Sequence, residues 1–175
     1  MAERKKEVII NIMWEGPFSF EEVSEKNDTK KDRGVYQIYG PHPVYGHEAL
    51  LYIGKTERQT FCDRLKQHHD AWLNLDNRSK IAKFYVGRLI GKDTPNNQEW
   101  EHLIDIAEQL LIFYHYPAAN VKSITGLSDD KKFYDDEVQI FNWGIYRDLL
   151  PEVSGRRQTY RAYNEINGIG PFSDK

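Results

Sequence analysis

Two short segments near the middle of the chain have the composition of β-strands and lie close together. Residues 34–39 read GVYQIY, and residues 49–53 read ALLYI and are followed by Gly54. The connector, residues 40–46, is rich in glycine and proline. Because β-branched and aromatic residues favour strands while glycine and proline favour turns, this pattern predicts an antiparallel hairpin.

Two helices are predicted after the hairpin. Residues 60–73 place Phe61 and Leu65 on an inward face, and they place Arg64 and His68, four residues apart, together on another face. Residues 98–114 carry a continuous apolar stripe that indicates a long helix ending before Pro117. The stripe consists of Trp100, Leu103, Ile104, Ala107, Leu110, Leu111 and Tyr114.

Further elements complete an α+β plan in which helices pack on a small sheet. Residues 8–14 and 81–90 are predicted strands, and Ser19 with Glu22 fits the capping box of a short helix. We expect a single domain over residues 1–175. Its N-terminal arm (1–33) holds a strand and a short helix, its core spans 34–125, and an extension covers 126–175.

The composition narrows the class of protein. Of the 175 residues, 39% are hydrophobic and 13% aromatic, which is too apolar for a disordered chain. The single cysteine, Cys62, excludes an intramolecular disulfide and a cysteine-rich zinc site. The net charge of −3 argues against nonspecific coating of nucleic acid but leaves room for a local basic cleft. Without a signal peptide or an apolar run of membrane-spanning length, a cytoplasmic protein is expected.

Several polar residues could work together, although each has an ordinary structural explanation alone. Tyr36 and Tyr52 lie on neighbouring predicted strands, where their hydroxyls could meet or where both rings could serve as packing. A tyrosine acts as a general base only if its pKa falls well below about 10, which nearby cations would bring about. Lys55, Arg64 and His68 are the available cations. If they have no functional role, Lys55 lies in an exposed turn, and Arg64 and His68 lie on a solvated helix face.

Two more residues follow on and after the long predicted helix. Glu108 lies beside its apolar stripe and is either a solvated carboxylate or a ligand for Mg²⁺, which is typically held by one or two carboxylates together with water and phosphate. Asn120 comes after Pro117 and is otherwise a turn or cap residue.

Taken together, these residues resemble the pattern of the GIY-YIG nuclease family. Gly34-Val35-Tyr36 and Tyr52-Ile53-Gly54 are similar to the two name-giving triplets, with only Val35 departing from their letters. The family's arginine, histidine, glutamate and asparagine follow in the same order, and the resemblance covers about residues 34–122. The matching residues are Arg64, His68, Glu108 and Asn120.

The resemblance implies a core with a three-stranded antiparallel sheet flanked by helices. It also implies a metal-dependent endonuclease that hydrolyses DNA phosphodiester bonds. Tyr36 looks like the general base, tuned by Tyr52 and His68, while Arg64 and Lys55 would neutralise the phosphate and Asn120 would position the site. Glu108 would bind Mg²⁺, for which Mn²⁺ is the expected substitute.

The expected substrate is double-stranded DNA. Lys83 and Arg88 lie in a basic stretch, and Arg156 and Arg157 form a second one, so these four are candidate DNA contacts. A core with short arms is similar to the small restriction enzymes of this family, for which a homodimer on a two-fold site is expected. The alternatives are a structure-specific repair or phage nuclease, a noncatalytic nucleic-acid-binding module with this fold, and a purely structural interaction protein.

Overall fold

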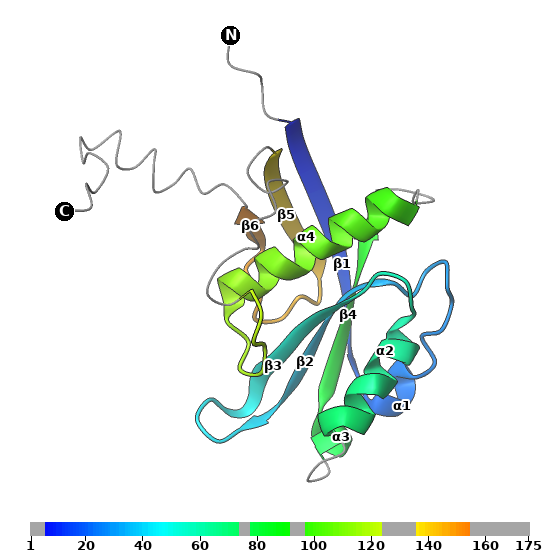
Figure 1. The fold of residues 1–175 in the computed structure, drawn as a ribbon. Helices are drawn as coiled ribbons and strands as arrows, with labels where there is room; N and C mark the ends of the chain where they lie inside the picture. Colours follow the sequence, from blue (N-terminus) through cyan, green and yellow to red (C-terminus); the bar gives the residue numbers. More distant parts are fainter. Residues whose placement is uncertain (1–5, 74–77, 92–96, 124–135, 155–175) are drawn as a thin grey trace, which may run out of the picture.

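A six-stranded sheet with the order β3-β2-β4-β1-β5-β6 is the frame of the protein (Figure 1). The computed structural model describes residues 6–73, 78–91, 97–123 and 136–154. The strands are β1 (Lys6–Phe18), β2 (Gly34–His42), β3 (Gly46–Thr56), β4 (Lys83–Ile90), β5 (Asp136–Gly144) and β6 (Glu152–Ser154).

The predicted hairpin is confirmed, because β2 and β3 pair in antiparallel fashion with Tyr36 opposite Gly54. Strand β4 also pairs antiparallel with β2. The sheet is nevertheless larger than the three strands expected from the sequence. On its far side β4 pairs with β1, β1 pairs in parallel with β5, and β5 pairs with β6. The arm and the extension therefore contribute strands to the sheet.

The helices begin where the sequence supplies caps. Ser19 and Glu22 form the predicted capping box at α1 (Phe20–Val23), and Thr60 with Asp63 forms another at α2 (Phe61–His68). The predicted helix over residues 60–73 continues beyond α2 as a π-helical turn, η1 (His69–Leu73). Helix α3 (Arg78–Ile81) precedes β4, and α4 (Asn97–His115) is the long helix that the apolar stripe predicts.

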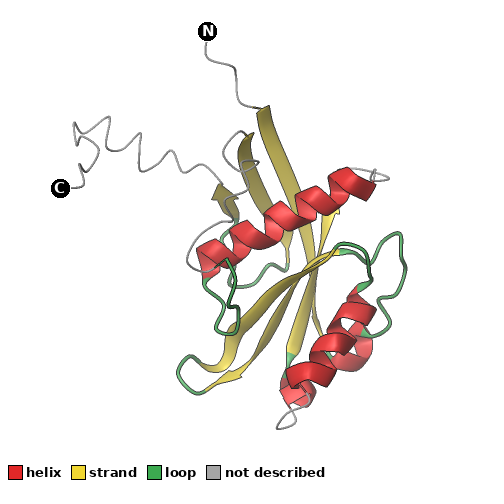
Figure 2. Ribbon diagram, in the orientation of Figure 1, coloured by secondary structure: helices red, strands yellow, loops and turns green. Residues whose placement is uncertain are grey.

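Alternate residues of β2 enter two separate apolar clusters, one on each face of the strand. Val35 and Tyr39 join the cluster that contains the apolar side of α4, whereas Tyr36 and Ile38 join the cluster that contains residues of α2. Figure 2 shows α4 lying apart from the group formed by α1, α2 and α3. Across the described segments, no helix combines the length and the apolar character that crossing a membrane requires.

Candidate functional site

The glycines of the two triplets permit close contacts that a side chain would block. A Cβ atom on Gly54 would lie 2.5 Å from Cζ of Tyr36 and 2.7 Å from Cε1 of Tyr52. A Cβ atom on Gly34 would overlap the carbonyl oxygen of Gly87 in β4, and Gly34 has a φ of +148°. Glycine is therefore needed at both positions to bring the strands and the two tyrosine rings together.

Tyr36, Tyr52 and His68 form a cluster of three rings between β2, β3 and the last residue of α2. The hydroxyl of Tyr36 lies 2.6 Å from Nε2 of His68 in a buried hydrogen bond. The ring centroid of Tyr52 lies 4.8 Å from that of His68 and 6.2 Å from that of Tyr36. The structure thus joins these three predicted site residues.

The protonation of this cluster differs from the sequence-based expectation. Burial, with the neighbouring Tyr52, raises the pKa of Tyr36 well above its usual value, and only partial compensation comes from the charge of Arg64. Burial and the charge of Arg64 lower the pKa of His68 to about 4, so this ring is neutral at neutral pH. The expectation that His68 acts as a cation and lowers the pKa of Tyr36 is therefore wrong for the free protein.

Arg64 lies on α2 with its guanidinium directed at the tyrosine cluster. Burial lowers the pKa of Arg64, but its interactions with Tyr36, which include a hydrogen bond, and with Tyr52 and Glu108 outweigh this effect and raise it. Nη1 donates to Oε1 of Gln67 at 3.0 Å, while Nε is buried and has no hydrogen-bond partner among the described residues. A buried donor without an acceptor is costly to the fold.

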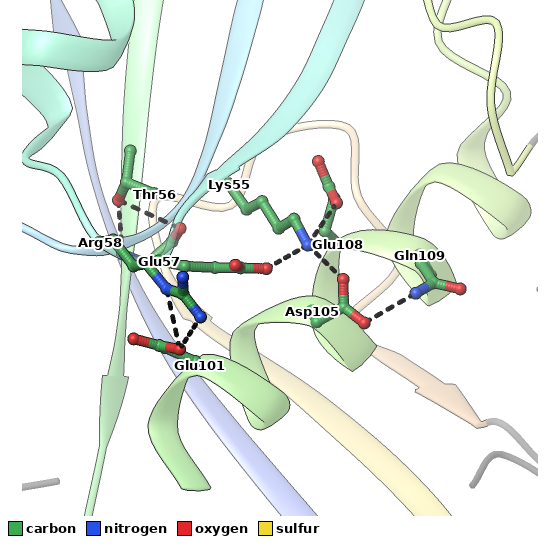
Figure 3. A network of polar contacts seen from close by, with 9 residues as sticks. Lys55, Thr56, Glu57, Arg58, Glu101, Asp105, Glu108 and Gln109 are labelled. Carbon is green, nitrogen blue, oxygen red and sulfur yellow. Dashed lines mark hydrogen bonds and ion pairs between the residues drawn. The ribbon is translucent and has the colours of Figure 1, made fainter. Parts of the chain in front are cut away.

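Lys55, directly after the second triplet, lies within a network of carboxylates (Figure 3). Its Nζ makes close ion pairs with Glu57 and Asp105 and lies 3.6 Å from Oε2 of Glu108. Burial lowers the pKa of Lys55, but the hydrogen bonds to Asp105 and Glu57 outweigh that effect and raise it. Lys55 therefore remains charged, and its ammonium group is ion-paired with carboxylates of the same chain.

Glu108 projects from α4 toward Lys55, and its side chain is only 17% exposed. Burial raises the pKa of Glu108 to about 7; Lys55 opposes this effect, whereas Asp105 and Glu57 add to it. Glu108 is thus a largely desolvated carboxylate rather than part of a solvated helix face.

Asp105 and Glu57 are members of this network that the sequence reasoning did not assign. The signals were present, since Asp105 lies one helical turn before Glu108 and Glu57 lies two residues after Lys55.

Asn120 links the loop after α4 to the outer edge of β3. The backbone N–H of Ile53 donates to Oδ1 of Asn120 at 2.9 Å, and Nδ2 of Asn120 donates to the carbonyl oxygen of Ile53 at 2.9 Å. Ala118 and Ala119 donate their N–H groups to carbonyls of the same strand. The strand that carries Tyr52 and Lys55 is thereby fastened to the segment that follows Glu108.

The candidate DNA contacts lie in other surroundings. Lys83 is ion-paired with Glu48 at the surface. Arg88 donates to Asp32 at 2.6 Å, forms an ion pair with Glu15 at 2.9 Å, and lies over the ring of Phe61. Both cations are engaged within the chain, and Arg156 and Arg157 lie outside the described residues.

The side chains of the site could supply only part of the ligand sphere of a magnesium ion. Within the described segments, no group of three or more His, Cys, Asp or Glu side chains could hold a metal ion. Glu108 supplies one buried carboxylate, and Mg²⁺ commonly takes one or two carboxylates and completes its octahedron with water and substrate phosphate. The residues therefore fit Mg²⁺ if a phosphate substrate supplies further oxygens.

Comparisons of the chain with protein-family models, with curated proteins and with solved structures found no match.

Proposed function

We propose that this protein is a metal-dependent endonuclease of the GIY-YIG type that hydrolyses phosphodiester bonds in double-stranded DNA. The observation that carries the proposal is the guanidinium of Arg64, within hydrogen-bonding reach of Tyr36, beside the cluster that Tyr36 forms with Tyr52 and His68. Glu108 is near enough for its charge to act on both tyrosines. A guanidinium, a carboxylate and a tyrosine–histidine pair are groups that phosphodiester hydrolysis can use.

Arg64 has the chemistry to hold the scissile phosphate. Its guanidinium, which stays charged, would donate to the phosphate oxygens. Charge accumulates on the phosphate oxygens as a nucleophile attacks, so a fixed guanidinium lowers the barrier more than it stabilises the bound ground state.

Tyr36 and His68 supply a route for a proton. Because His68 is neutral, its Nε2 can accept the hydroxyl proton of Tyr36, and the tyrosine oxygen can in turn accept a proton from an attacking water. In the free protein the pKa of Tyr36 is raised by burial and lowered by Arg64, so this transfer requires more positive charge beside the Tyr36 hydroxyl than Arg64 alone provides.

Glu108 is the residue that would hold the metal ion, with Mn²⁺ as a substitute for Mg²⁺. A bound divalent ion would supply positive charge to the phosphate and to the leaving oxygen. Its binding would also stabilise the ionised form of Glu108, whose pKa burial raises to about 7. Site-specific, restriction-type cleavage by a homodimer remains part of this proposal, because paired cuts in a duplex require two active sites.

The test is cleavage of supercoiled and linear duplex DNA with Mg²⁺ by the wild type, Glu108→Gln and Arg64→Ala. Glu101→Gln is a matched control, because Glu101 lies on the same helix and pairs with Arg58 instead of Lys55. We expect discrete fragments with the wild type and the control and none with the other two variants. Cleavage that persists in Glu108→Gln would contradict the assignment of the metal ligand.

One observation favours a second candidate, a nucleic-acid-binding module without catalysis. The hydroxyl of Tyr36 is buried and its pKa is raised, which suits a structural role better than that of a ready base. This candidate predicts DNA binding that is weakened by Arg64→Ala together with no cleavage under any divalent ion. Cleavage lost in Tyr36→Phe, with DNA affinity unchanged, would exclude it.

A further inference from the structure

The ammonium group of Lys55 has three carboxylates within reach and is not shared equally among them. Glu57 and Asp105 make close ion pairs with Nζ, whereas Oε2 of Glu108 stays 3.6 Å away (Figure 3). The side chains of Lys55 and Glu108 are 26% and 17% exposed, so solvent only partly screens the interaction between their charges.

Asp105 is itself held in place. Its Oδ2 accepts a hydrogen bond from Nε2 of Gln109 at 2.9 Å, which leaves Oδ1 to face Lys55. Asp105 and Glu108 are one turn apart on α4, and Glu57 approaches Nζ from the opposite side, directly after the end of β3. The two close partners thus fix Nζ from two different segments of the chain.

We propose that Asp105 is a positioning residue that holds Lys55 off Glu108, so that the Glu108 carboxylate stays open to a divalent cation. This inference rests on the proposed function, in which Glu108 binds the metal ion. Without the charge of Asp105, the ammonium group gains by moving onto Glu108, where it competes with the cation for the same oxygens.

The direct electrostatic effect of each charge on cation binding must be separated from the positioning role of Asp105. Removing any nearby negative charge weakens cation binding, and removing the positive charge of Lys55 strengthens it. If that were the whole effect, the changes in binding free energy for Asp105 and Lys55 would add. Under the proposal, Asp105 acts through Lys55, and its replacement has little effect once Lys55 is gone.

The experiment is a double-mutant cycle with the full chain and Mn²⁺ as the probe, measured by calorimetry and by the electron paramagnetic resonance of free Mn²⁺. The variants are Asp105→Asn, Lys55→Met and the double variant, with Asp105→Glu as the conservative rescue. Glu101→Gln is the matched control, since it removes the same charge from α4 at a residue paired with Arg58.

We expect Asp105→Asn to weaken Mn²⁺ binding about fivefold, the scale of one rearranged ion pair. Lys55→Met should tighten binding, the double variant should bind like Lys55→Met, and Asp105→Glu and Glu101→Gln should bind like the wild type. Additive changes, or an unchanged affinity in Asp105→Asn, would overturn the inference.

The variant Glu108→Gln tests the metal assignment of the proposed function separately from the role of Asp105. If this variant binds Mn²⁺ as tightly as the wild type, the metal assignment in the proposed function fails and the inference falls with it. If Glu108→Gln loses Mn²⁺ but the cycle is additive, the metal assignment stands and only the role of Asp105 is overturned.

Discussion

The hydroxyl of Tyr36 and Nε2 of His68 are 2.6 Å apart, in a place where both residues are closed to solvent. The bond joins the N-terminal part of β2 to the last residue of α2. A buried imidazole that pairs with a neutral hydroxyl gains nothing from a proton, which explains why its ring stays uncharged. The pair therefore makes the fold sensitive to acid.

The stability of the protein should fall in acid because of His68. Burial lowers its pKa from 6.5 to about 4, so between these values the unfolded chain binds a proton that the folded chain does not. The stability from this group is complete above pH 6.5 and is lost as the pH falls toward 4, up to about 3 kcal/mol. Urea unfolding across this range should show a smaller loss in His68→Gln.

His69→Gln is the control for that measurement, because His69 adjoins His68 in the sequence but stacks on Phe20 away from the tyrosines. It should follow the wild-type pH dependence. Equal slopes for the wild type and His68→Gln would show that the His68 ring is not the source of the acid sensitivity.

Gly54→Ala should damage the fold and the site together. The new methyl group would overlap the Tyr36 ring, with Cζ at 2.5 Å, and neither ring can withdraw because both are held by packing. We expect a loss of about 1–3 kcal/mol in the free energy of unfolding, as for other overpacked cores. Chemical denaturation measures this loss.

Gly40→Ala is the matched substitution in β2. There the new methyl group meets only a terminal atom of Leu51, at 2.9 Å, which can move aside. It should cost clearly less than Gly54→Ala. A similar loss of stability at both positions would mean that contact with the Tyr36 ring does not explain why glycine is needed at position 54.

The features that could be predicted from the sequence are those set by neighbours along the chain. The hairpin, the capping box at Ser19 and the stripe of α4 each depend on residues a few positions apart. The parallel pairing of β1 with β5 joins segments from opposite ends of the chain. No local pattern specifies such a partner, so the full width of the sheet was not predicted.

The same distinction applies to the site. The hairpin places Tyr36 and Tyr52 on neighbouring strands, as predicted, and their rings stack. The protonation of His68 and the partners of Lys55 depend on burial and on side chains from α4, which become visible only once the helix is placed against β3. Residue types and spacing therefore indicated which side chains come together around the hairpin but not their charge states.

Asn120→Ala should free the outer edge of β3. It would leave the N–H and C=O of Ile53 without their buried partners, which costs about 1–3 kcal/mol. Hydrogen exchange measured by NMR should show the Ile53 amide losing its protection. Asn11→Ala removes an exposed bond to Trp143 and should cost much less, and an Ile53 amide that stays protected in Asn120→Ala would contradict the link.

Arg88 and Lys83 should respond differently to loss of charge, although both come from one basic stretch of β4. Arg88 pairs with Asp32, which is only 7% exposed, so Arg88→Gln leaves a buried carboxylate unpaired and should cost about 3 kcal/mol. The pair of Lys83 with Glu48 lies at the surface, and Lys83→Gln should cost less than about 1 kcal/mol.

Binding of duplex DNA measured at several salt concentrations tells which of the two contacts phosphate. A lysine in contact with one phosphate contributes roughly one unit to the slope of log affinity against log salt. Because Arg88 has its donors engaged by Asp32, Glu15 and the carbonyl of Lys31, we expect the folded Arg88→Gln variant to keep the wild-type slope. Lys83→Gln should reduce it. A reduced slope in Arg88→Gln alone would mean that DNA displaces these internal partners, and the sequence-based assignment of Arg88 to the DNA interface would then stand.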